Sequence, residues 1–76
     1  MPTLTRLPSC RIVMCAADHL PPHFHVIFND GREALVELAT LTSLAGDITM
    51  RVLAPALQWA QEHSDVLQQK WKELNP

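Results

Sequence analysis

The residues best suited to chemistry lie in one short segment, 18–26, which has the sequence Asp-His-Leu-Pro-Pro-His-Phe-His-Val. Three of the four histidines of the chain fall within it. His23 and His25 are two residues apart on a predicted strand, so their side chains point to the same face. Two imidazoles placed in this way can share a divalent metal ion. The candidates for further ligands are Asp18, His19, Glu37 and the distant His63.

The same segment also allows two other interpretations. Histidine titrates near neutrality, and a neighbouring carboxylate can fix its tautomer, which is the basis of general acid–base catalysis. An RNA phosphodiesterase, metal-dependent or purely histidine-based, would use His23 and His25 as ligands or as an acid–base pair and Glu37 as the orienting carboxylate. Alternatively nothing is bound: Asp18 and His19 cap a turn, and His23 and His25 pair with Glu37 and Glu33. No established zinc signature matches the spacing, so the sequence leaves all three open.

Two predicted strands, 23–28 and 32–38, position this segment, because apolar and polar residues alternate in both. A two-residue turn at 30–31 would set the apolar face of one strand against the acidic face of the other. A three-residue turn, 29–31, with Gly31 in a left-handed conformation, avoids this conflict. We therefore predict a hairpin with the longer turn.

This register assigns a partner to each residue of the hairpin. Apolar side chains then share one face, while histidines and glutamates gather on the reverse face, which we expect to be polar and partly solvated. The predicted pairs are Phe24–Val36 and Val26–Ala34 on the core face, and His23–Glu37, His25–Leu35 and Ile27–Glu33 on the reverse face.

The rest of the chain supplies a further strand and a helix. Residues 10–15 are apolar and β-branched, which favours a first strand after an extended arm, and 40–46 read as a loop or a short fourth strand. Asp47 and Thr49 are candidate caps for a helix that continues to the end of the chain, with Pro55 bending its early turns. The predicted fold is α+β: a small antiparallel β-meander of three or four strands packed on one long C-terminal helix. Its expected core is Phe24, Val26, Phe28, Ala34, Val36, Leu53, Leu57, Ala60 and Leu67.

Such a helix is longer than a short sheet can cover, so part of it should contact another molecule. A chain of this size also often gains stability by pairing with another subunit. We therefore expect a homo-oligomer, most simply a dimer, whose interface includes Trp71, Leu74 and Leu67.

The composition limits the class of protein. The 76 residues form a single predicted domain, 1–76, and 47% of them are hydrophobic. Six Lys and Arg against eight Asp and Glu give a net charge of -2, which disfavours general binding to nucleic acid. No apolar run approaches the ~20 residues that span a bilayer, so we expect no membrane association.

Two cysteines indicate the compartment. Cys10 and Cys15 fall in one predicted strand, where residues rise by about 3.3 Å each, so the two are beyond disulfide reach. Reduced thiols are typical of the cytoplasm, and Arg6, Pro8 and Arg11 interrupt any signal-peptide-like stretch. We expect a cytoplasmic protein.

The segment 18–26 closely resembles the hallmark motif of a family of small bacterial proteins catalogued as domain of unknown function 4160. Other positions that match the family's pattern are Met14, Glu33, Ala34, Gly46, Arg51, Trp59, His63, Leu67 and Trp71. The chain departs from the family at Thr49 and Lys70, which replace a proline and an asparagine, and at Pro55.

The resemblance implies no reaction, but it does imply a genetic setting. Such proteins often look like one half of a two-gene cassette with toxin–antitoxin-like organisation. We therefore expect a small non-enzymatic accessory protein that binds another protein, a second copy or the product of a neighbouring gene, and has no resident cofactor. The alternative is the phosphodiesterase of the His23 and His25 face, with a divalent metal held by Asp18, His19, His23 and His25.

Overall fold

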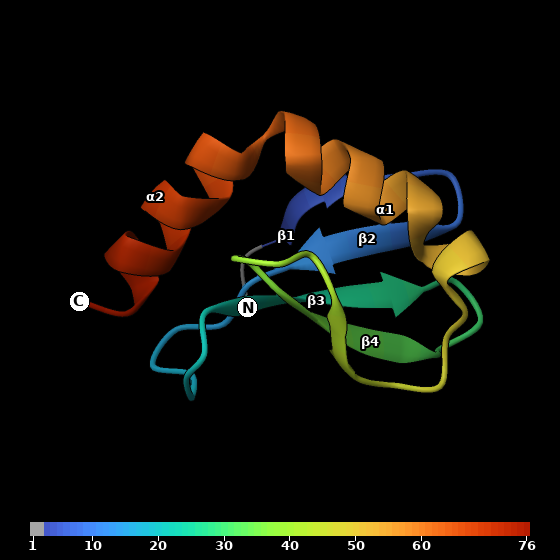
Figure 1. Cartoon of the computed structure of the whole chain (residues 1–76), viewed down its shortest axis with the longest axis horizontal. Helices are drawn as coiled ribbons and strands as arrows, with labels where there is room; N and C mark the ends of the chain where they lie inside the picture. Colours follow the sequence, from blue (N-terminus) through green and yellow to red (C-terminus); the bar gives the residue numbers. More distant parts are fainter. Residues whose placement is uncertain (1–2) are drawn as a thin grey trace.

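The computed structural model describes residues 3–76, so the first two residues of the expected domain 1–76 lie outside the described residues. A five-stranded antiparallel sheet has its strands in chain order, and two helices lie across one of its faces (Figure 1). The elements are β1 (Thr3–Arg6), β2 (Cys10–Val13), β3 (His23–Phe28), β4 (Glu33–Glu37), β5 (Ser43–Ala45), α1 (Met50–Glu62) and α2 (Ser64–Leu74). The α+β class and the meander are confirmed. The extended arm forms an additional edge strand, β1, and the short strand expected within 40–46 is β5.

The predicted register of the central hairpin is confirmed. His23 pairs with Glu37, Phe24 with Val36 and Ile27 with Glu33, as the three-residue turn required. Gly31 has φ +93°, and its N–H donates to the carbonyl of Phe28 at 2.9 Å. A residue with a Cβ is strained at that φ, so glycine suits this turn.

The single long helix was a wrong prediction: the chain forms two helices that meet at His63. The backbone there leaves the helical region, with φ -121° and ψ 30°. His63 stacks on Trp59, with ring centroids 4.3 Å apart, and its Nδ1 donates to the Trp59 carbonyl at 2.8 Å. The Trp59 carbonyl also accepts the His63 N–H at 3.0 Å, and the same N–H lies 3.3 Å from the Ala60 carbonyl, as is common in the last turn of a helix. The change of direction keeps Leu67 and Trp71 of α2 on the core, where both are buried.

The start of the first helix agrees with the sequence. Thr49 is the N-cap, and its side chain accepts a hydrogen bond from the Val52 N–H at 3.3 Å. Pro55 lies inside α1 without ending it.

The core lies between the helices and the inner face of the sheet. All expected core residues are buried except Leu57, which is half-buried against them. The buried apolar set is Cys10, Ile12, Met14, Phe24, Val26, Phe28, Ala34, Val36, Leu53, Ala56, Ala60, Leu67 and Trp71. Within residues 3–76, no helix is long and apolar enough to span a membrane. Both cysteines are free thiols, as expected.

Candidate functional site

The turn between β2 and β3 carries the chemistry-bearing residues, and the end of α2 holds this turn in place. The Ala17 N–H donates to the Leu74 carbonyl at 3.2 Å, and the Asp18 N–H donates to Asn75 Oδ1 at 2.7 Å. Asn75 Nδ2 in turn donates to the Cys15 carbonyl at 3.4 Å. Asp18 is thus positioned by contacts with residues almost 60 positions away in the chain.

Asp18 is the centre of a cluster that we call the Asp18 cluster: Cys15, Asp18, His19, His23 and His25. Its Oδ1 accepts the His19 N–H at 2.8 Å, which confirms that Asp18 caps the turn. Its Oδ2 lies 3.1 Å from Nε2 of His23 and 3.2 Å from Nε2 of His25. Nε2 of His19 lies 3.7 Å from Oδ1. All three histidines of the motif therefore direct the same ring nitrogen at one carboxylate.

The other ring nitrogen of each histidine contacts an oxygen acceptor. His23 Nδ1 lies 2.8 Å from the carbonyl of Pro21, and His19 Nδ1 lies 3.3 Å from the carbonyl of Leu20. His25 Nδ1 lies 2.6 Å from Oε2 of Glu33. The predicted pairing of His25 with Glu33 is therefore confirmed, and the diagonal position of Glu33 across the hairpin accounts for it.

His23 departs from the expectation of a solvated face. Its residue is 0% exposed, and its ring packs beside Trp71, with centroids 5.5 Å apart, and on His19, at 4.7 Å. The turn and α2 enclose His23, the first residue of β3. The alternation of apolar and polar residues within the strand does not show where the turn or the helix lies. His23 and Glu37 are strand partners as predicted, but the predicted contact between their side chains is wrong: His23 faces Asp18, and the Glu37 carboxylate accepts a hydrogen bond from Thr40 at 2.8 Å.

The electrostatics of the cluster follow from these contacts. Burial opposes charging of His25, but hydrogen bonds to Glu33 and Asp18 outweigh it and raise its pKa above the ordinary value. The hydrogen bond from His25 is the main cause that lowers the pKa of Asp18. Burial, reinforced by the negative charge of Asp18, raises the pKa of the Cys15 thiol. Charge on Asp18 and His25 is thus mutually stabilised.

The structure assembles some predicted site residues and separates others. Asp18, His19, His23 and His25, the candidate metal ligands, meet in the Asp18 cluster. Glu37 forms no hydrogen bond or ion pair with a histidine in the described part of the chain, so the acid–base set of His23, His25 and Glu37 is not assembled. His63 is far along the chain and stacks on Trp59 instead.

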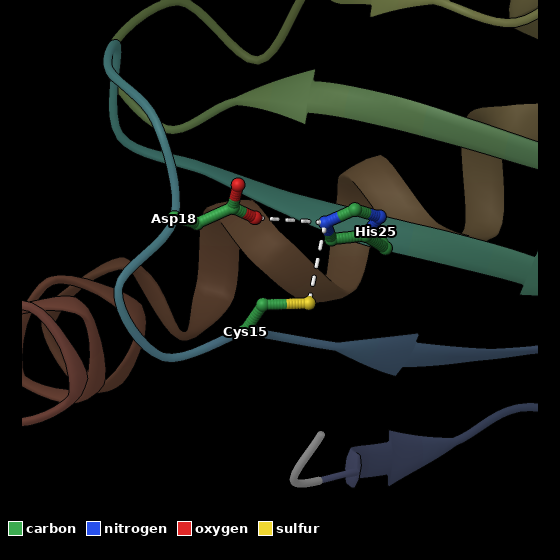
Figure 2. A group of neighbouring side chains, drawn as sticks. All are labelled: Cys15, Asp18 and His25. Carbon is green, nitrogen blue, oxygen red and sulfur yellow. Dashed lines mark hydrogen bonds and ion pairs between the residues drawn. The ribbon is translucent and has the colours of Figure 1, made fainter.

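Two contributors to the site were missed by sequence reasoning. Cys15 places its Sγ 3.6 Å from His25 Nε2 (Figure 2). Its proximity in sequence to the motif was visible, but the sequence did not place the strand 10–15 in the sheet, and only the observed pairing of Val13 with His25 brings Cys15 to this histidine. Asn75 had no signal, because only the packing of α2 brings it to the turn.

The residues of α2 that we expected at a dimer interface pack instead against the core of their own chain. Leu67 is buried, Trp71 is nearly so, and Leu74 is half-buried against the same core. Trp71 also lines a shallow hollow of about 350 Å³ between α2 and the turn. Its other lining residues are Pro21, Pro22, Glu37, Leu38, Ala39, Gln68 and Lys72.

The second face of the sheet lies opposite the helices (Figure 1), and the strand register places both apolar and charged residues on it. We call it the outer face and define it by Arg11, Val13, His25, Ile27, Glu33 and Leu35. Ile27 and Leu35 are half-buried on this face, whereas Val13 is fully buried. One row across the sheet joins Arg11, Ile27 and Glu33, in that order.

The fold and the Asp18 cluster define a small α+β module in which a turn, fixed by the end of the last helix, presents a carboxylate to three histidines. The chain belongs to the family described as Domain of unknown function (DUF4160), which matches residues 10–72 and includes the whole cluster. The resemblance inferred from 18–26 is thereby confirmed. Searches of curated proteins and of solved structures found no match.

Proposed function

We propose that the protein is a small non-enzymatic interaction module that binds a second copy of itself through the outer face. The observation that carries this proposal is the row Arg11, Ile27 and Glu33 across three adjacent strands. Neighbouring strands lie about 4.8 Å apart, so a cation and an anion flank one apolar side chain at similar distances. Each half of the row is the electrostatic complement of the other.

Such a row is complementary to itself under twofold symmetry. A twofold axis parallel to β3 would set Arg11 of one copy opposite Glu33 of the other and would bring the two Ile27 side chains together. An isologous contact of this kind uses the same surface patch twice. In the neighbouring row, Leu35 lies beside His25 and is half-buried, so it would add apolar contact, whereas Val13 is already buried within the chain. Complementary charge favours this orientation and speeds association.

The geometry supports binding over hydrolysis of RNA. An acid–base pair must reach its substrate, and the fully enclosed His23 has no exposed surface. Glu37, the proposed orienting carboxylate, is bonded to Thr40. The family match is compatible with a role in a two-gene cassette of toxin–antitoxin-like organisation, in which the neighbouring product would be a second partner.

The test is the oligomeric state at micromolar concentration, measured by analytical ultracentrifugation. We expect wild type to be a dimer and Ile27→Arg to be a monomer, since an unpaired charge in an interface costs roughly 2–5 kcal/mol, or about 30-fold to several thousand-fold in Kd. The matched control is Val66→Arg, which adds the same charge at an exposed apolar residue of α2 and should remain dimeric. Arg11→Glu is a milder second variant and should weaken the dimer without disturbing folding.

A monomeric wild type, or equal dissociation of Val66→Arg, would overturn the proposal. Co-expression with the neighbouring gene product, followed by size-exclusion chromatography, extends the test. Recovery of a complex that Ile27→Arg loses supports use of the outer face, whereas a complex that this variant leaves intact places partner binding elsewhere and contradicts it.

A further inference from the structure

We infer that the Asp18 cluster binds a divalent transition-metal ion such as Zn²⁺, with Cys15 Sγ, Asp18 Oδ2 and His25 Nε2 as its protein ligands (Figure 2). The site shares His25 and Glu33 with the outer face, but the inference does not depend on dimer formation and rests on tautomers, distances and one buried nitrogen beside the site.

The hydrogen bonds at Nδ1 determine where the histidine lone pairs lie. The carbonyl of Pro21 and the carboxylate of Glu33 accept hydrogen bonds, so Nδ1 of His23 and Nδ1 of His25 both carry hydrogen. In the neutral imidazole the other nitrogen, Nε2, presents a lone pair, and His25 reaches this form by releasing the proton that it otherwise donates to Asp18, as metal binding requires. Nδ1 bonded to a carboxylate or carbonyl and Nε2 free to ligate is the arrangement of metal-binding histidines.

These lone pairs converge on an atom that is itself electron-rich. Asp18 Oδ2 lies within 3.2 Å of both Nε2 atoms. His23 Nε2 is fully buried and has no hydrogen-bond partner among the described residues. A buried polar atom left unpaired is costly, and a nitrogen lone pair facing a carboxylate oxygen repels it. A cation bound at Asp18 Oδ2 draws charge from the oxygen that faces the His23 lone pair and so lessens this repulsion, while His23 itself is not a ligand of the assigned ion.

The two distances from His25 to the other ligands fit a tetrahedral ion, and all three ligand atoms lie within 4.8 Å of one another. Zinc lies about 2.0–2.1 Å from nitrogen or oxygen and about 2.3 Å from sulfur, so tetrahedral ligands are separated by roughly 3.3 Å for N and O and roughly 3.6 Å for N and S. The distance from His25 Nε2 to Asp18 Oδ2 is 3.2 Å, and that from His25 Nε2 to Cys15 Sγ is 3.6 Å. All three residues are half-buried, so a fourth position is open to solvent or to a ligand.

The second possible ligand set in the Asp18 cluster suits a metal ion less well. Asp18, His19 and His23 also lie close enough to share an ion. However, the His19 side chain is 68% exposed and its Nε2 is 3.7 Å from the carboxylate. By contrast, Glu33 holds the ring of His25 in the ligating orientation, as a carboxylate does behind a zinc-bound histidine.

The experiment titrates chelator-treated, reduced protein with ZnCl₂ by calorimetry and with CoCl₂ by absorption spectroscopy. We expect one ion per chain and, for cobalt, the near-ultraviolet charge-transfer band of a thiolate ligand. Cys15→Ser should abolish that band, and His25→Gln should weaken zinc binding at least tenfold. Glu33→Gln, which leaves all three ligands in place and alters the hydrogen bond that orients His25, should weaken zinc binding about 10- to 100-fold.

Matched controls separate ligation from general damage. Cys10→Ala removes the other thiol and should retain the band, and Glu37→Gln neutralises the other carboxylate of β4 and should retain the affinity. Circular dichroism checks folding, and Asp18→Asn serves as the ligand variant if Cys15→Ser unfolds. The Ile27→Arg variant should bind zinc as wild type does, which separates this site from the dimer contact.

Two results would overturn the assignment. One is the absence of saturable zinc binding and of the cobalt band in wild type. The other is binding that survives Cys15→Ser and His25→Gln but is lost in His19→Gln, which would move the ion to the other side of Asp18.

Discussion

Replacement of Gly46 by alanine should destabilise the protein more than the same change at Gly31, and the structure shows why. Both glycines have positive φ, +106° and +93°. A Cβ at Gly46 would lie 2.5 Å from the Glu33 carbonyl oxygen and 2.9 Å from the Ala34 Cα. A Cβ at Gly31 would have nothing within 4 Å. Alanine at either position would therefore suffer the same backbone strain, but only alanine at Gly46 would also overlap with neighbouring atoms.

The magnitudes follow from these two contributions. Left-handed backbone with a Cβ costs about 1–2 kcal/mol, which is the whole expected effect of Gly31→Ala. Overpacking against rigid neighbours costs a further ~1–3 kcal/mol, because both atoms in the way at Gly46 belong to backbone. We expect Gly46→Ala to lower the free energy of unfolding by about 2–5 kcal/mol, by pushing β5 from β4.

Urea denaturation followed by circular dichroism measures both variants. With a slope of about 1 kcal/mol/M, the midpoint of Gly46→Ala should lie roughly 1–3 M below that of Gly31→Ala. Equal midpoints would refute the reasoning, since they would mean that the edge of the sheet relaxes and that Gly46 is required for its φ alone. A shift of β4 should also disturb Glu33, so Gly46→Ala should weaken the hydrogen bond to His25.

Two further predictions concern the site and the core. In EDTA, which removes metal, the pKa of His25 in the folded chain is raised by its neighbours Glu33 and Asp18, with Cys15 also close by. The resulting stabilisation is fully present below the pKa of histidine in the unfolded chain, near 6.5, and is lost as pH rises through the pKa of His25 in the folded chain. The denaturant midpoint of wild type should therefore fall from pH 6 to 8 relative to His25→Gln, and parallel curves would contradict this. Leu53→Ala leaves a cavity at a fully buried position of α1 and should lower the free energy of unfolding by about 2–5 kcal/mol. Val66→Ala, at an exposed position of α2, should lower it by less than ~0.5 kcal/mol. Equal losses in thermal or urea unfolding would be inconsistent with the described core.

Tertiary contacts decided the environment of the histidines and the path of the helices. The alternation of β3 puts His23 on the reverse face, but its burial depends on Trp71 of α2 and on a turn tied down by Asn75. The break between α1 and α2 at His63, where the side chain stacks on Trp59, was likewise not revealed by the apolar spacing along the helices, which is interrupted only at Ser64. Contacts between residues far apart in the chain leave no periodic signal, so no local pattern could have shown them.

The sequence by itself determined the central hairpin, its register and its apolar face, because a side-chain period of two and a three-residue turn ending in Gly31 allow only one consistent pairing. It also brought out the histidine motif, since residues two apart on a strand must share a face. Only the tertiary structure converted that motif into a site. The cluster forms because the end of α2 fixes Asp18 over β3 and leaves a buried His23 nitrogen facing it, and the position of α2 depends on core packing across the whole chain.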